Sequence, residues 1–163
     1  MITITAVDKA YAAGVVDSDG CIRVVKEGRS DTRMRSATYY PLVLVSQADG
    51  EAIQFLQSKW GGCIHKSAQS GGRELFIFRW AVSWKKAEEF LADIVPYLRI
   101  KKSQALLALQ TRGRNVHVQS RRTDGTTMPL TQSEITRRED IFLQLKEMKK
   151  HHNHPTLTMK GVA

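Results

Sequence analysis

Residues 10–25, which read AYAAGVVDSDGCIRVV, are the stretch from which the fold can be inferred. The first half has the small residues of a closely packed helix, and the second half alternates like a strand. Asp17 and Asp19 stand at the junction, followed by Gly20. A carboxylate in the last turn of a helix meets the negative end of the helix dipole, which costs typically ~0.3–1 kcal/mol. Breaking a local rule without a structural gain is typical of functional sites.

The predicted helix at residues 5–18 carries a stripe of small residues. Ala10, Ala13 and Gly14 lie at helical spacing, and a mid-helix glycine costs roughly 0.5–1 kcal/mol relative to alanine. A bare stripe lets two helices approach at or below the usual ~8–10 Å. Because no other segment repeats this helix, the pattern predicts a homodimer about a two-fold axis, with Ala10, Ala13, Gly14 and Asp17 at the interface. The alternative is that the stripe packs on the chain's own sheet.

In such a dimer, the aspartates of both copies gather near the axis. Like charges that close need counter-cations. Lysine is one option, but hard divalent ions favour carboxylate and backbone oxygens. The pattern therefore predicts a pair of Mg²⁺ sites at the foot of the dimer axis. That arrangement suits phosphodiester cleavage, in which metal ions activate water and stabilise the leaving oxygen.

The rest of the chain predicts an α+β fold. Strands are expected at 21–29, 37–47, 63–69 and 73–83, and helices at 49–60 and 84–98, the latter capped by Ser83. Two hairpins separated by a helix give a four-stranded antiparallel sheet with helices on one face. Residues 1–163 are expected to form a single domain, with a core at about 5–112, a C-terminal loop and helix at 113–150 and a frayed tail at 151–163.

The composition favours an anionic partner. The 163 residues contain 25 Lys+Arg against 16 Asp+Glu, giving a formal net charge of +9, and nucleic acid is the commonest anionic partner. Cys21 and Cys63 form no CxxC pair, so buried reduced thiols are expected rather than a zinc site. The sequence shows no signal peptide and no apolar run that could span a bilayer. We therefore expect an intracellular protein, in the cytoplasm or an organelle, with no membrane partner and no organic cofactor.

One face of the predicted sheet is expected to stay open. Phe76, Phe78 and Trp80 share a face that suits the core, whereas Arg79 points the other way. The opposite face mixes charged, polar and apolar residues, which is typical of a surface that binds something polar and anionic. For any single residue, a merely solvated position is an equal alternative.

The residues AAGVVDSDG (12–20) resemble the LAGLIDADG motif of homing endonucleases. Ala13, Gly14, Asp17, Asp19 and Gly20 match the motif, whereas Ala replaces Leu at its first position and three other positions carry Val, Val and Ser. The segment VPYLRIKKSQA (95–105) resembles the one before the C-terminal helices in the dimeric branch. The resemblance covers about residues 7–112 and implies the αββαββα fold with a saddle-shaped sheet. A single motif copy implies a homodimer.

The resemblance also implies roles for single residues. Asp19 is the metal ligand in each subunit, joined by the backbone carbonyl of Ser18. The ion is Mg²⁺, and Mn²⁺ or Ca²⁺ can occupy the same sites. Gln47 matches a residue that orders water near the scissile phosphate, and Lys101 matches a basic residue that supports water activation and stabilises negative charge. Asp17 is structural or a weaker electrostatic contributor.

One position departs from the family's pattern. Some members have a further basic residue four positions after the glutamine, where this chain has Glu51. Either Arg23 or another cation substitutes, or the active site is weaker than usual.

The resemblance further implies that the paired sheets form a saddle over double-stranded DNA. Arginine side chains prefer guanine edges and phosphates. The candidates for base and phosphate contacts are Arg23, Arg29, Tyr40, His65, Gln69, Arg73 and Arg79, and those for holding the backbone are Arg33, Arg35, Arg121 and Arg122.

The expected function is therefore site-specific cleavage of double-stranded DNA in intron homing, by Mg²⁺-dependent phosphodiester hydrolysis at a long pseudo-palindromic target. An RNA maturase or a non-cleaving DNA-binding regulator with the same fold is the alternative, which Glu51 favours. A third class, an unrelated basic ribosome-associated or structural protein, leaves the helix-end aspartates unexplained.

Overall fold

The computed structural model describes residues 3–28, 37–68, 76–111 and 131–152. The order of elements confirms the predicted helix–strand–strand–helix–strand–strand–helix core. None of the helices in the described ranges is long and apolar enough to cross a membrane. The elements are α1 (Ala6–Asp19), β1 (Gly20–Glu27), β2 (Thr38–Gln47), α2 (Glu51–Trp60), β3 (Cys63–Ala68), β4 (Phe76–Ser83), α3 (Trp84–Ile94), α4 (Lys102–Leu109) and α6 (Gln132–His152).

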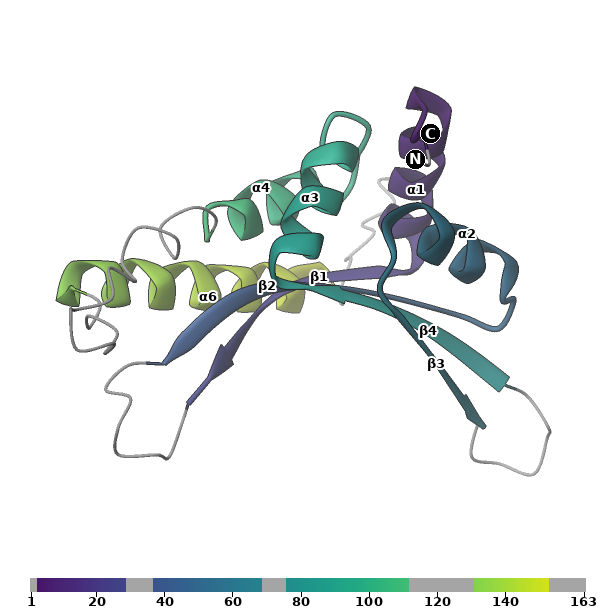
Figure 1. Cartoon of the computed structure of the whole chain (residues 1–163). Helices are drawn as coiled ribbons and strands as arrows, with labels where there is room; N and C mark the ends of the chain where they lie inside the picture. The colour runs from purple at the N-terminus through teal and green to yellow at the C-terminus, as the bar shows by residue number, and fades with distance from the viewer. Residues whose placement is uncertain (1–2, 29–36, 69–75, 112–130, 153–163) are drawn as a thin grey trace, which may run out of the picture.

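The four strands form one antiparallel sheet in the order β1-β2-β4-β3. Figure 1 shows this sheet bent into an arch, with the β1–β2 pair as one leg and the β4–β3 pair as the other. The helices of the described residues lie above or beside the arch, so its concave underside is open. We call this underside the open face.

The strand alternation that predicted the core is confirmed, with one exception. Ile22, Val43 and Trp80 are fully buried under the helices and pack with Phe90 of α3. Phe76 was also expected in the core but is 42% exposed. Its end of β4 extends beyond the helices, so the correct face of the strand is not sufficient for burial there.

The signals for the ends of helices were mostly correct. Thr5 and Asp8 form the predicted capping box, since Asp8 N–H donates to Thr5 Oγ1 and Thr5 N–H donates to the Asp8 carboxylate. Gly61 and Gly62 end α2 with φ values of 70° and 95°. The prediction that Ser83 caps α3 was wrong, because its side chain makes no capping hydrogen bond.

The C-terminal helix α6 is held against the edge strand β1. Lys26 of β1 forms an ion pair with Glu139 of α6 at 2.7 Å, and the Tyr39 hydroxyl also donates to Glu139. The helix extends to His152, slightly beyond the predicted boundary at residue 150. The edge of the sheet is thereby covered by a helix, which protects it from pairing with other chains.

Both cysteines are free, as predicted. Cys21 is partly buried, but Cys63 is exposed at the start of the edge strand β3, so the expectation of two buried thiols was wrong for Cys63.

Candidate functional site

Asp19 and Gln47 meet at the top of the arch. Asp19 is the last residue of α1 and Gln47 the last residue of β2, and pairing of Gly20 with Val45 brings these two ends together. The Gln47 side-chain amide donates to Asp19 Oδ2 at 2.8 Å. The Ser18 hydroxyl donates to the same oxygen at 3.1 Å. The structure therefore brings together two residues that the sequence placed in one active site.

A polar surface hollow of about 560 Å³ opens beside this pair. Three carboxylates line it, those of Asp19, Asp49 and Glu51. Glu51 is thus in the position where its negative charge adds to that of Asp19, rather than offsetting it. Tyr11 of α1 also lines the hollow, and sequence reasoning missed it because it lies one helical turn outside the nine-residue motif.

Asp17 has a different environment from Asp19. Its carboxylate accepts hydrogen bonds from the backbone N–H groups of Arg99 (2.7 Å), Ile100 (3.2 Å) and Lys101 (2.9 Å). Burial acts to raise the pKa of Asp17, but these three donors together hold it below its ordinary value. Asp17 therefore has a structural task, and its negative charge needs no metal ion.

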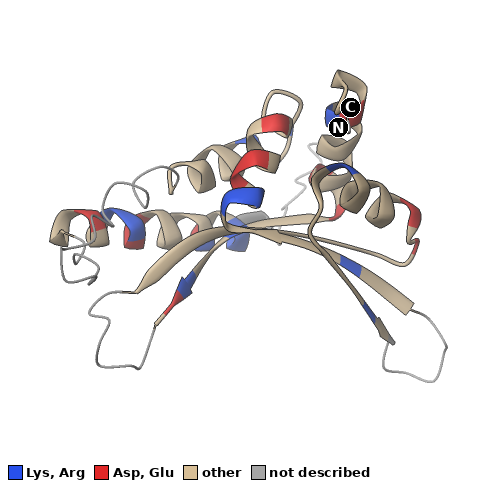
Figure 2. Ribbon diagram, in the orientation of Figure 1, with Lys and Arg blue, Asp and Glu red and all other residues tan. Residues whose placement is uncertain are grey.

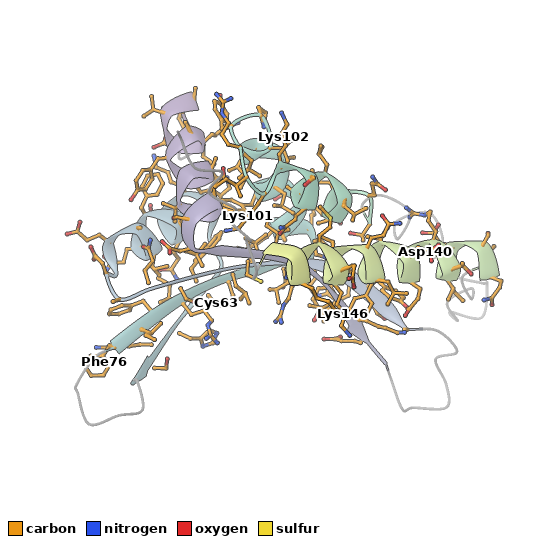
Figure 3. All side chains as sticks on the ribbon, turned by 180° about the vertical axis from the view of Figure 1, so that it is seen from behind. Cys63, Phe76, Lys101, Lys102, Asp140 and Lys146 are labelled. Atoms are coloured by element: carbon orange, nitrogen blue, oxygen red, sulfur yellow. The ribbon has the colours of Figure 1, made fainter. Side chains whose placement is uncertain are left out.

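Lys101 performs the reciprocal task for α1. Its ammonium donates to the backbone carbonyls of Val16 (2.8 Å), Asp17 (2.8 Å) and Ser18 (3.3 Å), which end the helix. Figure 3 shows Lys101 between α1 and the start of α4. The side chain is 8% exposed. Desolvation lowers the pKa of Lys101, although the nearby carboxylates of Asp17 and Asp19 oppose this effect.

The two contacts explain charges that appeared misplaced in the sequence. An acid at the end of α1 and a lysine at the start of α4 each oppose the dipole of their own helix. Each charge lies instead at the favourable end of the other helix, where it satisfies backbone groups that have no partner within a helix. The acidic end of α1 is thus explained for Asp17, whereas Asp19 remains without such a structural role.

The end of α6 adds a cation near this site. The Lys149 ammonium lies 3.1 Å from Cys21 Sγ, two residues after Asp19. Sequence reasoning missed Lys149, because a basic residue near a helix C-terminus has an ordinary explanation in the helix dipole.

The register places the predicted nucleic-acid contacts of the described residues on the open face. Arg23 lies opposite Leu42, and His65 lies opposite Arg79. Arg23, His65 and Arg79 are exposed, and Arg79 Nε donates to Ser46 at 3.3 Å. Figure 2 shows basic residues on both legs of the arch. The other candidates, Arg29, Arg33, Arg35, Gln69, Arg73, Arg121 and Arg122, lie outside the described residues.

The proposed dimer stripe of α1 is only partly as predicted. Gly14 and Ala10 are exposed, beside the exposed apolar residues Val7 (78%) and Tyr11 (50%). A Cβ placed on Gly14 would meet no described atom within 4 Å, so nothing in the described part of the chain requires a glycine. Ala13 was also assigned to the interface but is 1% exposed and packs in the chain's own core. The prediction for Ala13 was wrong because the helix turns that position toward the sheet.

The donor set fits a divalent cation only incompletely within one chain. Asp19 is an exposed carboxylate on the polar hollow, and Gln47 and Ser18 bind only its Oδ2 atom. The Ser18 carbonyl, the second predicted ligand, already accepts from Lys101. Among the described residues no group of three His, Cys, Asp or Glu side chains could hold a metal ion. Further oxygens would have to come from another copy, from water or from a substrate.

Comparison with known proteins gives structural likeness only. No protein-family model and no curated protein matches the sequence. Among solved structures, the homing endonuclease I-CvuI matches with a TM-score of 0.53 and 22% identity over 88% of this chain and 96% of its own. The archaeal intron-encoded homing endonuclease I-Vdi141I matches with a TM-score of 0.61 and 16% identity, covering 86% and 83%.

A third structure differs in length. The LAGLIDADG homing endonuclease I-GzeII matches with a TM-score of 0.58 and 12% identity over 98% of this chain but only 53% of its own. At these identities the comparisons establish the fold. The chain has the α+β fold of the LAGLIDADG homing endonucleases, as the motif at residues 12–20 predicted.

Proposed function

We propose that the protein is a homodimeric, Mg²⁺-dependent endonuclease that cuts both strands of duplex DNA at a long pseudo-palindromic site, in intron homing. It acts inside the cell or an organelle. The observation that carries the proposal is the Asp19–Gln47 pair, in which an exposed carboxylate lies at the top of an arch with a cationic and polar open face. Asp19 has no structural contact comparable to those of Asp17, so its position at a helix end is best accounted for by chemistry.

The residues of the chain divide the work as follows. Asp19 would hold the metal ion through its carboxylate. A bound Mg²⁺ would lower the pKa of a water molecule and stabilise negative charge on the leaving oxygen. Gln47 fixes the Asp19 carboxylate through its amide and presents its own carbonyl oxygen to water in the hollow. Lys101 holds the end of α1, which sets the position of Asp19 and adds a nearby positive charge.

The structural neighbours support the substrate and the metal. I-CvuI was solved with its DNA target in the presence of Ca²⁺, and with another DNA target in the presence of Mg²⁺ that was not cleaved. I-SmaMI was solved on an uncleaved DNA target with calcium ions. The open arch of the present chain offers the same kind of surface, with arginine side chains on both legs.

The lengths of the neighbours support the homodimer. The chain spans almost all of I-CvuI but about half of I-GzeII and of I-SmaMI. A chain of the longer type has room for two such units, whereas the present chain has one. An exposed stripe at Val7, Ala10, Tyr11 and Gly14 provides a self-complementary surface for a two-fold contact.

A second function, nucleic-acid binding without cleavage, is favoured by one observation. Asp49 and Glu51 line the hollow together with Asp19, and their charges repel a phosphate. A maturase or regulator with this fold would tolerate that repulsion better than a nuclease.

The test is cleavage of a plasmid library carrying random inserts, with Mg²⁺ and with EDTA, followed by sequencing of the new ends. The proposed function requires ends that share one site of two related half-sites, and only with the metal ion. Specific binding to a selected duplex without any cut ends would support the second function, and binding restricted to RNA would identify a maturase. Loss of cleavage in the Asp19→Asn variant with retained binding connects the activity to this site.

A further inference from the structure

Trp84 combines two features that its place in the fold does not require. It is the first residue of α3, directly after β4, and its φ value of 57° is the one positive φ among non-glycine residues in the described ranges. A bulky side chain makes this conformation unfavourable. The indole is also 45% exposed. The unfavourable backbone therefore places a large apolar side chain partly in solvent.

The indole stacks on a ring of the open face. The Tyr40 and Trp84 rings lie 4.1 Å apart at an interplanar angle of 13°. Tyr40 lies opposite Val25 of β1 and alternates along β2 with the buried residues Tyr39 and Val43, which places it on the open face. The stack therefore forms an aromatic platform, Tyr40 and Trp84, at the surface that the proposed function assigns to DNA.

The Tyr40 ring is held in place from the other side. Its hydroxyl donates to the Glu27 carboxylate at 2.5 Å, and this hydrogen bond raises the pKa of Tyr40. The hydroxyl is therefore occupied within the protein, so Tyr40 supports the indole more than it offers a polar contact of its own. A fixed platform loses little conformational entropy when it binds.

We propose that Trp84, supported by Tyr40, reads the C5-methyl group of a thymine in the major groove of each half-site. This inference rests on the proposed function. Apolar side chains recognise thymine through that methyl group. One face of the indole is already covered by Tyr40, and the bases of an intact duplex offer no free face for stacking, so a methyl contact suits duplex DNA best.

The geometry limits where the thymine lies. Tyr40 is seven residues before Gln47 on the same strand, a distance of about 23 Å at ~3.3 Å per residue. With 3.4 Å between base pairs along one strand, this distance spans at most about seven base pairs. The thymine should therefore lie within about seven base pairs of the bond cut in the same half-site.

The test begins with the wild-type protein and a duplex selected from a random library. Each thymine of one half-site is replaced in turn by deoxyuridine, which removes only the methyl group. We expect about a fourfold loss of affinity at one thymine within the predicted distance, since burial of a group of that size contributes ~0.8 kcal/mol. A wild-type protein that binds every deoxyuridine duplex equally well overturns the inference.

Two variants separate reading from folding. Trp84→Gly relieves the positive φ, so its unfolding temperature should not fall below that of the wild type, while the deoxyuridine effect disappears. Phe76→Ala is the control, because Phe76 is similarly exposed but belongs to the other face of β4 and lies at its far end (Figure 3). It should keep the effect.

The remaining outcomes also decide. A deoxyuridine effect that persists in Trp84→Gly assigns the methyl contact to another residue and overturns the inference alone. A lowered unfolding temperature with an unchanged effect shows that the stack is structural. A wild-type protein that selects no duplex, or only single-stranded RNA, overturns the inference and the proposed function together, whereas selection and a Trp84-dependent effect without cleavage overturn only the nuclease activity.

Discussion

At the scale of single residues, Asp17 and Asp19 differ in what their carboxylates contact. Asp17 receives three backbone N–H groups, and its charge lies at the start of the segment that leads into α4. Asp19 receives one amide and one hydroxyl and stays exposed on the hollow. Two acids two positions apart therefore have separate tasks, one in the architecture and one that is available for chemistry.

Asp19→Asn tests the chemical task. The change removes the charge but keeps the shape, so Mg²⁺-dependent cleavage should fall by about 100-fold or more, while DNA binding survives or tightens. The free energy of unfolding should change by less than about 0.5 kcal/mol, because the side chain is exposed. Asp49→Asn, with the same loss of charge in the same hollow, is the control for cleavage and binding. Wild-type cleavage by Asp19→Asn would exclude Asp19 as the metal ligand.

Lys101→Met tests a structural task that the resemblance did not suggest. The variant leaves three carbonyls at the end of α1 without their donor, in a place that water reaches poorly. The free energy of unfolding should drop by about 2–3 kcal/mol in chemical denaturation. Lys102→Met is the neighbouring control and should be nearly neutral, because Lys102 is exposed. A variant as stable as the wild type would mean that Lys101 does not hold the helix, and any loss of cleavage would then be chemical.

At the scale of elements, the sequence predicted the order of helices and strands and the open face. These rest on local periods, and residues such as Ile22 and Trp80 obey them. The Asp17–Lys101 exchange was not predicted, because it joins residues 84 positions apart through the packing of two helices. The backbone of Trp84 was also missed, since a serine before a helix looks like an ordinary cap.

The first turn of α6 supplies a prediction about pH. Glu134 is buried with Arg137 and Arg138, at 2.9 and 2.8 Å. The hydrogen bond to Arg137 is the largest cause of a pKa of about 2 for Glu134. Because the folded pKa is depressed, the stabilisation is fully present above the unfolded pKa of ~4.3 and is lost as the pH falls toward 2.

Glu134→Gln should therefore destabilise the protein at pH 7 by up to about 3 kcal/mol. The difference in free energy of unfolding from the wild type should shrink as the pH falls from 5 toward 2, in denaturant titrations at each pH. Glu147→Gln, farther along the same helix and more exposed, is the control. A gap that stays constant from pH 7 to pH 3 would show that the charge of Glu134 contributes little.

At the scale of the whole molecule, one chain presents half of the proposed machinery. It has one Asp19, one hollow and one arch, and its apolar stripe on α1 is exposed. A second copy related by a two-fold axis through α1 would cover that stripe and bring a second Asp19 to the foot of the helices. The two arches would then provide two similar half-sites, which is why the proposed target is pseudo-palindromic.

Gly14→Leu tests this assembly without harming the fold. A side chain at Gly14 meets no described atom, and leucine is favoured over glycine within a helix by up to about 1 kcal/mol. The isolated chain should therefore fold at least as well as the wild type. A leucine would nevertheless hold two helices apart at their closest approach, so sedimentation velocity should show a monomer where the wild type is a dimer. Cleavage of both strands should be lost with the dimer. Gln132→Leu, exposed at the far end of α6, adds the same side chain away from α1 and should leave the dimer intact. If Gly14→Leu still sediments as a dimer, the two copies meet through another surface, and Asp19 of one copy need not lie near that of the other.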